Sequence, residues 1–246
     1  MQQPVALITG AARRIGAAIT QQLWLQGYRV IIHCNNSTEA ATKTAEELNQ
    51  QRPDSARVLQ ADLNSSPQVA GLAHNALSCW GQIDLLVNNA SSFYPTPLEQ
   101  SSDQQWDDLI NSNLKAAYFL SAKLADSLKQ QQGCIINLVD IHAQRALPGY
   151  PIYSIAKAGL QMMTLSLAKE LAPAVRVNGV APGPILWPEE DAAISPEAQQ
   201  AILEKTLLKR TGTADDIAET VLFLAGQNFI TGQIIAVDGG KSLYSH

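Results

Sequence analysis

Short apolar segments alternate with longer amphipathic segments along almost the whole chain. The apolar segments are four to six residues long and most are rich in Val, Ile and Leu rather than alternating with polar residues. Strands that are buried on both faces of a parallel sheet have this pattern. We therefore predict strands at Val5–Ile8, Arg29–His33, Ala56–Gln60, Asp84–Val87, Cys134–Val139, Val175–Val180 and Ile234–Val237.

The segments between the predicted strands repeat their apolar residues with a helical period. In the first segment Ile15, Ile19 and Leu23 fall on one stripe, and Gly27 follows where a C-terminal cap would lie. Strand–helix alternation of this kind produces βαβ units with right-handed crossovers. Further helices are predicted at Thr38–Gln51, Pro67–Trp80, Asp103–Gln130, Ile152–Leu171 and Ala214–Ala225.

The alternation continues without a linker, an internal repeat or a low-complexity segment. It predicts a single domain over residues 1–246. The fold class is α/β, with a Rossmann-like, doubly wound parallel sheet of about seven strands. In this architecture ligands bind at the carboxyl ends of the strands.

Composition narrows the function classes. The 246 residues include 17 Lys and Arg against 22 Asp and Glu, so the net charge is −5 and the isoelectric point is near 5.3. A general nucleic-acid binder would be basic, and a membrane span needs about 18 consecutive apolar residues, which the chain lacks. There is no signal-peptide pattern, and the cysteines, at positions 34, 79 and 134, have no metal-site spacing. We expect a cytoplasmic protein that binds no metal, nucleic acid or membrane.

The loop after the first strand is a candidate nucleotide site. Gly10 and Gly16 bracket the segment GAARRIG, which opens the first helix. Small residues there let the backbone approach a pyrophosphate, and the helix N-terminus supplies N–H donors. Two glycines alone would also suit a plain strand-to-helix turn. The position at the start of an alternating chain favours the nucleotide site.

Three motifs together are similar to those of the short-chain dehydrogenase/reductase family. They are TGxxxxIG after the first strand, NNA after the fourth strand and YxxxK further on, and the similarity extends from Leu7 to Gly240. The family usually has glycine where Arg14 stands, and an arginine there resembles the pteridine reductase branch. The resemblance implies a cofactor site made by Gly10, Arg13, Arg14, Ile15, Gly16, Asp62, Leu63, Asn89, Ala90, Ser91, Lys157, Pro182 and Gly183. For Asp62, a cap of the turn before the next helix is the alternative role.

The end of the second strand indicates which dinucleotide binds. A carboxylate there would select NAD by accepting hydrogen bonds from the ribose 2′-OH. This chain has none, so a 2′-phosphate would meet no repulsion, and we predict NADP(H) as the cofactor. The candidate donors to that phosphate are Arg14, His33, Asn36 and Ser37. The alternative is that these residues merely begin the next helix, with Ser37 or Thr38 as its N-cap.

Tyr153 and Lys157 are candidate catalytic residues. Their four-residue spacing places them on one face of a helix, where the ammonium would lower the pKa of the tyrosine toward working pH. The pattern alone is common by chance, and an exposed pair is the alternative. The family resemblance implies that Asn113 supports a water chain to the lysine and that Pro182 and Gly183 form the nicotinamide-side loop.

Asp140 departs from the general family pattern. It lies thirteen residues before Tyr153, where the family usually has a serine that polarises the substrate. A carboxylate cannot replace that donor unless it is protonated. One alternative is an inactive homologue, and another is a helix cap. The functional interpretation is a proton relay of Asp140 and Tyr153 toward a ring nitrogen, and the pair Val139-Asp140 resembles the pteridine reductases.

A second segment agrees with the pteridine reductases. After NNA the family usually has glycine, but here Ser91 follows, with Phe93 two residues later. The resemblance implies that Ser91 binds cofactor phosphate and substrate and that Phe93 stacks on the pterin ring. For Phe93 alone, packing within its own loop is the more common role. A loop around residues 184–206 would cover the substrate, with Trp187 as a lid contact. For Trp187 alone, an exposed loop tryptophan that fills a surface groove is the more common role.

These observations predict an NADPH-dependent pteridine reductase that reduces dihydropterins, oxidised pterins or dihydrofolate to the tetrahydro form. Its substrate site would comprise Ser91, Phe93, Asp140, Tyr153 and Trp187. The alternatives are a short-chain carbonyl reductase, such as a 3-oxoacyl carrier-protein reductase, and a non-enzymatic NADP-binding regulator. The two long helices have apolar residues on more than one face, and the resemblance implies a family that is commonly tetrameric through these helices. We therefore predict a homotetramer, with tight packing within one chain as the alternative. The apolar residues are Leu109, Tyr118, Phe119, Met162, Met163 and Leu167.

Overall fold

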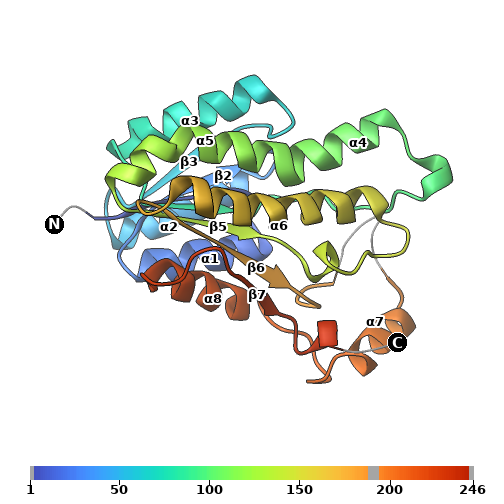
Figure 1. Ribbon diagram of the computed structural model, residues 1–246. Coiled ribbons are helices and arrows are strands. Elements are labelled where there is room, and N and C mark those ends of the chain that lie inside the picture. The colour runs from blue at the N-terminus through green and yellow to red at the C-terminus, as the bar shows by residue number, and fades with distance from the viewer. Residues whose placement is uncertain (1–2, 188–193, 244–246) are drawn as a thin grey trace.

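The computed structural model describes residues 3–187 and 194–243 and contains one seven-stranded parallel sheet. The strand order is β3-β2-β1-β4-β5-β6-β7, and each neighbouring pair is parallel. Figure 1 shows the sheet between two layers of helices, which confirms the predicted doubly wound α/β class. The strands are β1 (Val5–Ile8), β2 (Arg29–Cys34), β3 (Ala56–Gln60), β4 (Leu85–Asn88), β5 (Cys134–Leu138), β6 (Arg176–Pro182) and β7 (Ile234–Val237).

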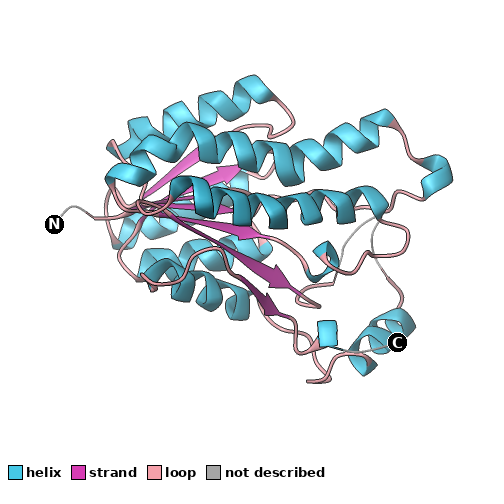
Figure 2. Cartoon of the chain, viewed as in Figure 1, coloured by secondary structure: helices cyan, strands magenta, loops and turns pink. Residues whose placement is uncertain are grey.

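Most helices begin and end within a residue or two of the predicted segments. Figure 2 shows these helices around the strands of the sheet. Gly27 follows the first helix with φ at +93°, as the predicted C-terminal cap requires. The helices are α1 (Arg14–Leu25), α2 (Thr38–Gln51), α3 (Ser66–Trp80), α4 (Asp103–Ile110), α5 (Ala116–Gln130), α6 (Pro151–Leu171), α7 (Pro196–Glu204) and α8 (Ala214–Gly226).

The sheet separates two hydrophobic clusters because successive strand residues point to opposite faces. In β1, Val5 and Leu7 pack with the apolar stripes of α3, α5 and α6, whereas Ala6 and Ile8 pack with α1, α2 and α8. All four of these β1 residues are fully buried. Burial on both faces is the reason that the strands are continuously apolar.

The prediction of one helix over Asp103–Gln130 is wrong in its middle. A π-helical turn, Asn111–Lys115, lies between α4 and α5, and no loop interrupts the helical segment. Within it, the Asn113 side chain donates to the Leu109 carbonyl at 3.0 Å, and the Ser112 hydroxyl donates to the Asp108 carbonyl at 2.6 Å. Such turns occur often at functional sites, and here the turn contains the candidate residue Asn113.

The strand order reverses direction between β1 and β4. β1 pairs with β2 on one side and with β4 on the other, so the loops after β1 and β4 leave the sheet in opposite directions. A crevice forms at such a point in doubly wound sheets. The sequence did not predict α7, which lies within the region 184–206.

Candidate active site

The loops after β1 and β4 touch with no room for a side chain between them. Gly10 has φ at +61°, and a Cβ on it would lie 2.9 Å from the Ala90 Cα. A Cβ on Gly16 would overlap the Gly10 carbonyl oxygen and would lie 2.7 Å from the Asn89 amide nitrogen. The two glycines are therefore required by close backbone approach and, at Gly10, by a left-handed conformation.

Hydrogen bonds between Thr9 and Asn89 join these two loops. The Thr9 hydroxyl accepts from the backbone N–H groups of Asn89 and Ala90 at 2.9 and 3.0 Å. The Asn89 side-chain amide donates to the carbonyls of Thr9 and Gly10 at 2.8 and 3.0 Å. The asparagine thus sets the shape of the glycine loop at the start of α1.

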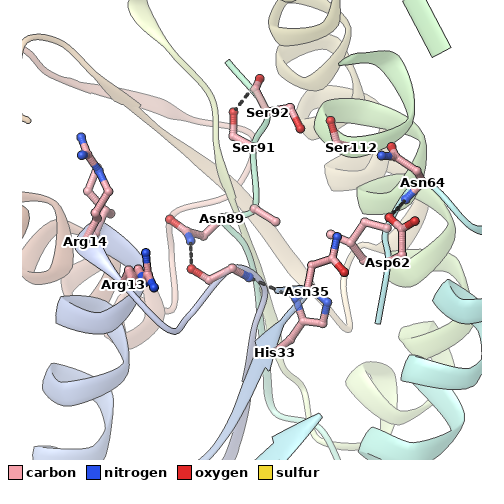
Figure 3. Close-up of a pocket in the computed structure, with 15 residues that line it drawn as sticks. Arg13, Arg14, His33, Asn35, Asp62, Asn64, Asn89, Ser91, Ser92 and Ser112 are labelled. Carbon is pink, nitrogen blue, oxygen red and sulfur yellow. Dashed lines mark hydrogen bonds between the residues drawn. The ribbon is translucent and has the colours of Figure 1, made fainter. Parts of the chain in front are cut away.

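A cavity of about 390 Å³ lies at this crevice, above the carboxyl ends of the strands. Figure 3 shows Arg13 and Arg14 on one side of it and Asp62 and Asn64 on the other. The structure brings together eleven of the predicted cofactor residues in its lining: Gly10, Arg13, Arg14, Ile15, Gly16, His33, Asp62, Leu63, Asn89, Ala90 and Ser91. Four lining residues were not predicted: Asn35, Asn64, Ser92 and Ser112.

Other predicted cofactor residues do not line this cavity. Asn36 is exposed, and Ser37 is the N-cap of α2, which agrees with the alternative role of this segment as a helix start. Pro182 ends β6, and Gly183 donates its N–H to the Val237 carbonyl at 3.0 Å. Asp62 lines the cavity and also accepts from the Asn64 N–H at 2.9 Å, so it forms the turn that was its alternative role.

The predicted donation by His33 to a ribose phosphate does not fit the structure. Its Nδ1 accepts from the Gly10 N–H at 3.1 Å, so its Nε2 carries the hydrogen and donates to the Ala61 carbonyl at 3.1 Å. The side chain is buried, and burial lowers the pKa of His33 to about 4. Both ring nitrogens are engaged, so the neutral imidazole shapes the glycine loop and leaves no donor for a phosphate.

The candidate catalytic side chains converge at the end of β5. The Tyr153 hydroxyl donates to Asp140 Oδ2 at 2.7 Å, and the buried Lys157 ammonium donates to the Leu138 carbonyl at 2.9 Å. Tyr153 is also buried, which excludes the exposed pair considered for the YxxxK pattern. Asp140 Oδ1 accepts from the His142 N–H at 2.8 Å and caps a short 3₁₀ turn, so the cap and the tyrosine contact occur together.

The expected lowering of the Tyr153 pKa is wrong for this arrangement. Burial and the Asp140 carboxylate raise the pKa of Tyr153 well above its usual value. The Lys157 ammonium lies over the face of the tyrosine ring, 5.6 Å from its centroid, rather than against the hydroxyl. Burial lowers the pKa of Lys157 to about 8, although Asp140 acts in the opposite direction. Tyr153 is therefore a protonated acid whose hydrogen points at a carboxylate.

Asn113 and Ser91 meet between the cavity and this cluster. The Ser91 hydroxyl donates to the Asn113 side-chain oxygen at 2.6 Å, and the Asn113 amide donates to the Ser92 carbonyl at 3.0 Å. Asn113 is buried in the π-helical turn. The turn therefore holds the loop after β4 beside Tyr153.

Phe93 lies in an aromatic cluster with residues of its own chain. Its ring stacks on Tyr150 at 4.7 Å between centroids, with 10° between the planes, and meets Tyr153 edge to face at 4.8 Å. This packing matches the alternative role considered for Phe93. Tyr150 was not predicted, since its contribution arises only when the loop before α6 folds against the loop after β4.

Arg14 links the glycine loop to the segment after β6. Its φ is +54°, a left-handed conformation that costs a residue other than glycine about 1 kcal/mol. Its guanidinium donates to the Trp187 carbonyl at 2.9 Å. Trp187 is half-buried at the edge of the described segment, and the neighbouring Glu189 and Glu190 lie outside the described residues.

Comparison with known proteins finds relatives whose sequences match almost the whole chain. A family profile described as enoyl-(acyl carrier protein) reductase matches residues 10–242. Pteridine reductase 1 of Leishmania tarentolae is 38% identical over 282 residues, covering 98% of this chain and 96% of the relative. A 3-oxoacyl-[acyl-carrier-protein] reductase of Staphylococcus aureus is 38% identical over 239 residues, covering 96% of each chain. The chain belongs to the short-chain dehydrogenase/reductase family.

The cavity residues of this short-chain dehydrogenase/reductase are suited to the nicotinamide dinucleotide that the family uses. Gly10 and Gly16 line the cavity where β1 leads into α1, and backbone N–H groups at the start of that helix suit a pyrophosphate. Among residues 3–187 and 194–243 no group of His, Cys, Asp and Glu could hold a metal ion. In the same part of the chain no helix has the length and apolar character to cross a membrane.

Proposed function

We propose that this protein is an NADPH-dependent pteridine reductase, which reduces the C=N bond of a dihydropterin to give the tetrahydro form. The observation that carries the proposal is the 2.7 Å hydrogen bond from the Tyr153 hydroxyl to Asp140. In a carbonyl reductase the substrate oxygen needs donors, and a carboxylate in place of the serine hydroxyl supplies an acceptor. A carboxylate–tyrosine pair instead suits delivery of a proton to a ring nitrogen.

The chain's own residues position the substrate and move the proton. A bound NADPH supplies the hydride, which goes to the carbon of the C=N bond. The Tyr153 O–H bond breaks as the N–H bond of the ring forms, and the oxygen regains a hydrogen through Asp140 from water. Lys157 would hold the nicotinamide ribose. Ser91 and Phe93 would contact the pterin, and Trp187 would close over it from the segment after β6.

The proposed preference for NADPH over NADH rests on the absence of a carboxylate at the end of β2, where the adenosine ribose would lie. β2 ends without a carboxylate, and Asn35 follows Cys34 at the cavity wall. The Arg14 guanidinium lies across from them, where a planar fork of donors would suit a phosphate. Since His33 is neutral and buried, the candidate cations for the 2′-phosphate are the two arginines that line the cavity, Arg13 and Arg14.

Replacing Arg14 with glycine tests this role. We expect Arg14→Gly to raise the KM for NADPH about tenfold and to leave the KM for NADH nearly unchanged, because only NADPH loses a charge-assisted hydrogen bond. We expect the melting temperature to stay the same or rise by a few degrees, since glycine adopts a φ of +54° without strain. Arg14→Lys is the control that keeps the charge. Equal effects on both cofactors would contradict the assignment.

The second candidate function is reduction of 3-oxoacyl thioesters, which the Staphylococcus aureus relative supports at 38% identity. The deciding experiment is NADPH consumption by the purified protein with 7,8-dihydrobiopterin, beside acetoacetyl thioester. We expect turnover of the pterin and none of the thioester. The reverse result would make the protein a carbonyl reductase with an altered serine site. Silence with both would favour the regulator, although the presence of Asn113, Tyr153 and Lys157 in the sequence argues against it.

We also propose that the protein is a homotetramer assembled through α5 and α6. Tyr118 and Phe119 on α5 and Met162 on α6 are exposed, which supports the proposal. Leu109, Met163 and Leu167 are buried within their own chain and would contribute nothing to such an interface. A second subunit would cover the exposed set.

A further inference from the structure

Asp108, on α4, joins two loops that approach the cavity from different strands. Its Oδ1 accepts from the Asn64 side-chain amide at 2.7 Å, and its Oδ2 accepts from the Tyr94 hydroxyl at 2.8 Å. Asn64 belongs to the loop after β3, and Tyr94 belongs to the loop after β4. Both oxygens of one half-buried carboxylate thus hold donors that are distant from it and from each other in sequence.

Each of the two loops carries part of the candidate site. Asn64 lines the cavity, and its backbone N–H is held by the Asp62 carboxylate at 2.9 Å. Tyr94 follows Phe93, whose ring contacts Tyr153. One loop is therefore on the cofactor side and the other is on the substrate side.

α4 runs directly into the π-helical turn, whose side chains reach the cavity and the loop after β4. The Ser112 hydroxyl donates to the Asp108 carbonyl at 2.6 Å, and Ser112 lines the cavity. The Asn113 amide donates to the carbonyls of Leu109 and Ser92, each at 3.0 Å. Asp108 therefore extends from a rigid element rather than from a third loop.

Burial makes the bond to Tyr94 the stronger of the two. Both bonds go to a carboxylate, and each is therefore worth more than a bond between neutral groups, but Tyr94 is half-buried whereas Asn64 is exposed to water. Burial and the Asp108 carboxylate raise the pKa of Tyr94 to about 12. The tyrosine stays a donor at any pH used for an assay.

We propose that Asp108 is a positioning residue that fixes the Phe93–Tyr94 segment for substrate binding and ties that segment to the cofactor-side loop at Asn64. The role rests on the proposed function only for the identity of the substrate, because the contacts themselves do not depend on which substrate binds. Asp108 acts through Tyr94 and Asn64 rather than on the reacting atoms.

The test compares four variants by hydrogen–deuterium exchange and steady-state kinetics. Tyr94→Phe removes only the substrate-side bond, Asn64→Ala removes only the cofactor-side bond, and Asp108→Asn disturbs both. Asp107→Asn is the matched control, since Asp107 is the next carboxylate on the same helix, is exposed, and makes no side-chain hydrogen bond to any other residue that the structure describes.

We expect Tyr94→Phe to raise the pterin KM about tenfold and to speed amide exchange in residues 91–96, with the dissociation constant of NADPH unchanged. Asn64→Ala should weaken NADPH binding about threefold and leave the pterin KM nearly unchanged. Asp108→Asn should produce both effects while kcat changes little, and Asp107→Asn should match the wild type.

The proposal is overturned if Tyr94→Phe leaves both exchange and KM at wild-type values, or if Asp107→Asn changes them as much as Asp108→Asn does. Its failure differs from failure of the proposed function. If the wild type reduces only the thioester, the exchange measurement still tests the positioning role, and the KM is then measured with the thioester. If the pterin is reduced but Tyr94→Phe changes nothing, only the positioning role is lost.

Discussion

A Tyr153→Phe protein should lose most of its turnover, with kcat lower by about 10²- to 10⁴-fold, the usual contribution of a positioned acid. The substitution removes one oxygen from a buried ring and keeps its contacts with Phe93 and Lys157. NADPH affinity should stay within about twofold, because the hydroxyl faces Asp140 rather than the glycine loop. Stopped-flow or steady-state oxidation of NADPH, with cofactor binding by fluorescence, measures both quantities.

The pH profile supplies a second test of the same assignment. The pKa of Tyr153 is raised well above its usual value, so the acid stays protonated through the assay range. The pKa of Lys157 is lowered to about 8, so its ammonium is lost as the pH rises through that value. We expect kcat/KM to fall above about pH 8, and the residual activity of Tyr153→Phe to fall over the same range.

Tyr150→Phe is the matched control for the tyrosine. It removes a hydroxyl at the start of the same helix and keeps the ring that stacks on Phe93. Its kcat should remain within about threefold of the wild type. Near-full pterin reduction by Tyr153→Phe would contradict the assignment of the acid. A basic limb that disappears in Tyr153→Phe would mean that the tyrosine, and not Lys157, titrates near pH 8.

The second large effect is expected at Asp140. Asp140→Ser should abolish most pterin reduction, lowering kcat by about 10²-fold or more, because the carboxylate that resupplies Tyr153 is gone. Serine is also a good N-cap, so it can accept from the His142 N–H in place of the carboxylate and preserve the 3₁₀ turn. The variant therefore separates the relay from the cap. Pterin turnover and the melting temperature are the measurements.

Asp140→Ala completes the comparison, since it removes both roles. We expect it to lose pterin reduction like the serine variant and to be less stable by about 1 kcal/mol, the usual cost of a lost cap. Unchanged pterin turnover in Asp140→Ser would leave Asp140 as a cap alone and would contradict the relay. Thioester reduction that appears in Asp140→Ser would indicate that this position selects between the two substrate classes.

The pattern of apolar and polar residues along the chain was sufficient to predict the α/β architecture. The inner strands β1, β4 and β5 are buried along their whole length, so their apolar character is continuous and visible in the sequence, and the helices that cover the sheet repeat their buried positions with a helical period. The motif spacings were also informative, because Tyr153 and Lys157 share a helix, and Gly10 and Gly16 lie where β1 leads into α1. Interactions within one element depend on spacing, which a sequence displays.

Contacts between elements were decided only by the tertiary structure. The sequence position of His33 predicts a phosphate donor, but the Gly10 N–H and the Ala61 carbonyl engage both of its ring nitrogens. The raised pKa of Tyr153 follows from where Asp140 and Lys157 lie around the ring, and the two loops joined by Asp108 are far apart in the chain. The sequence alone determined which elements form and which chemical groups they carry, whereas burial and the direction of each hydrogen bond arose when the strand ends met.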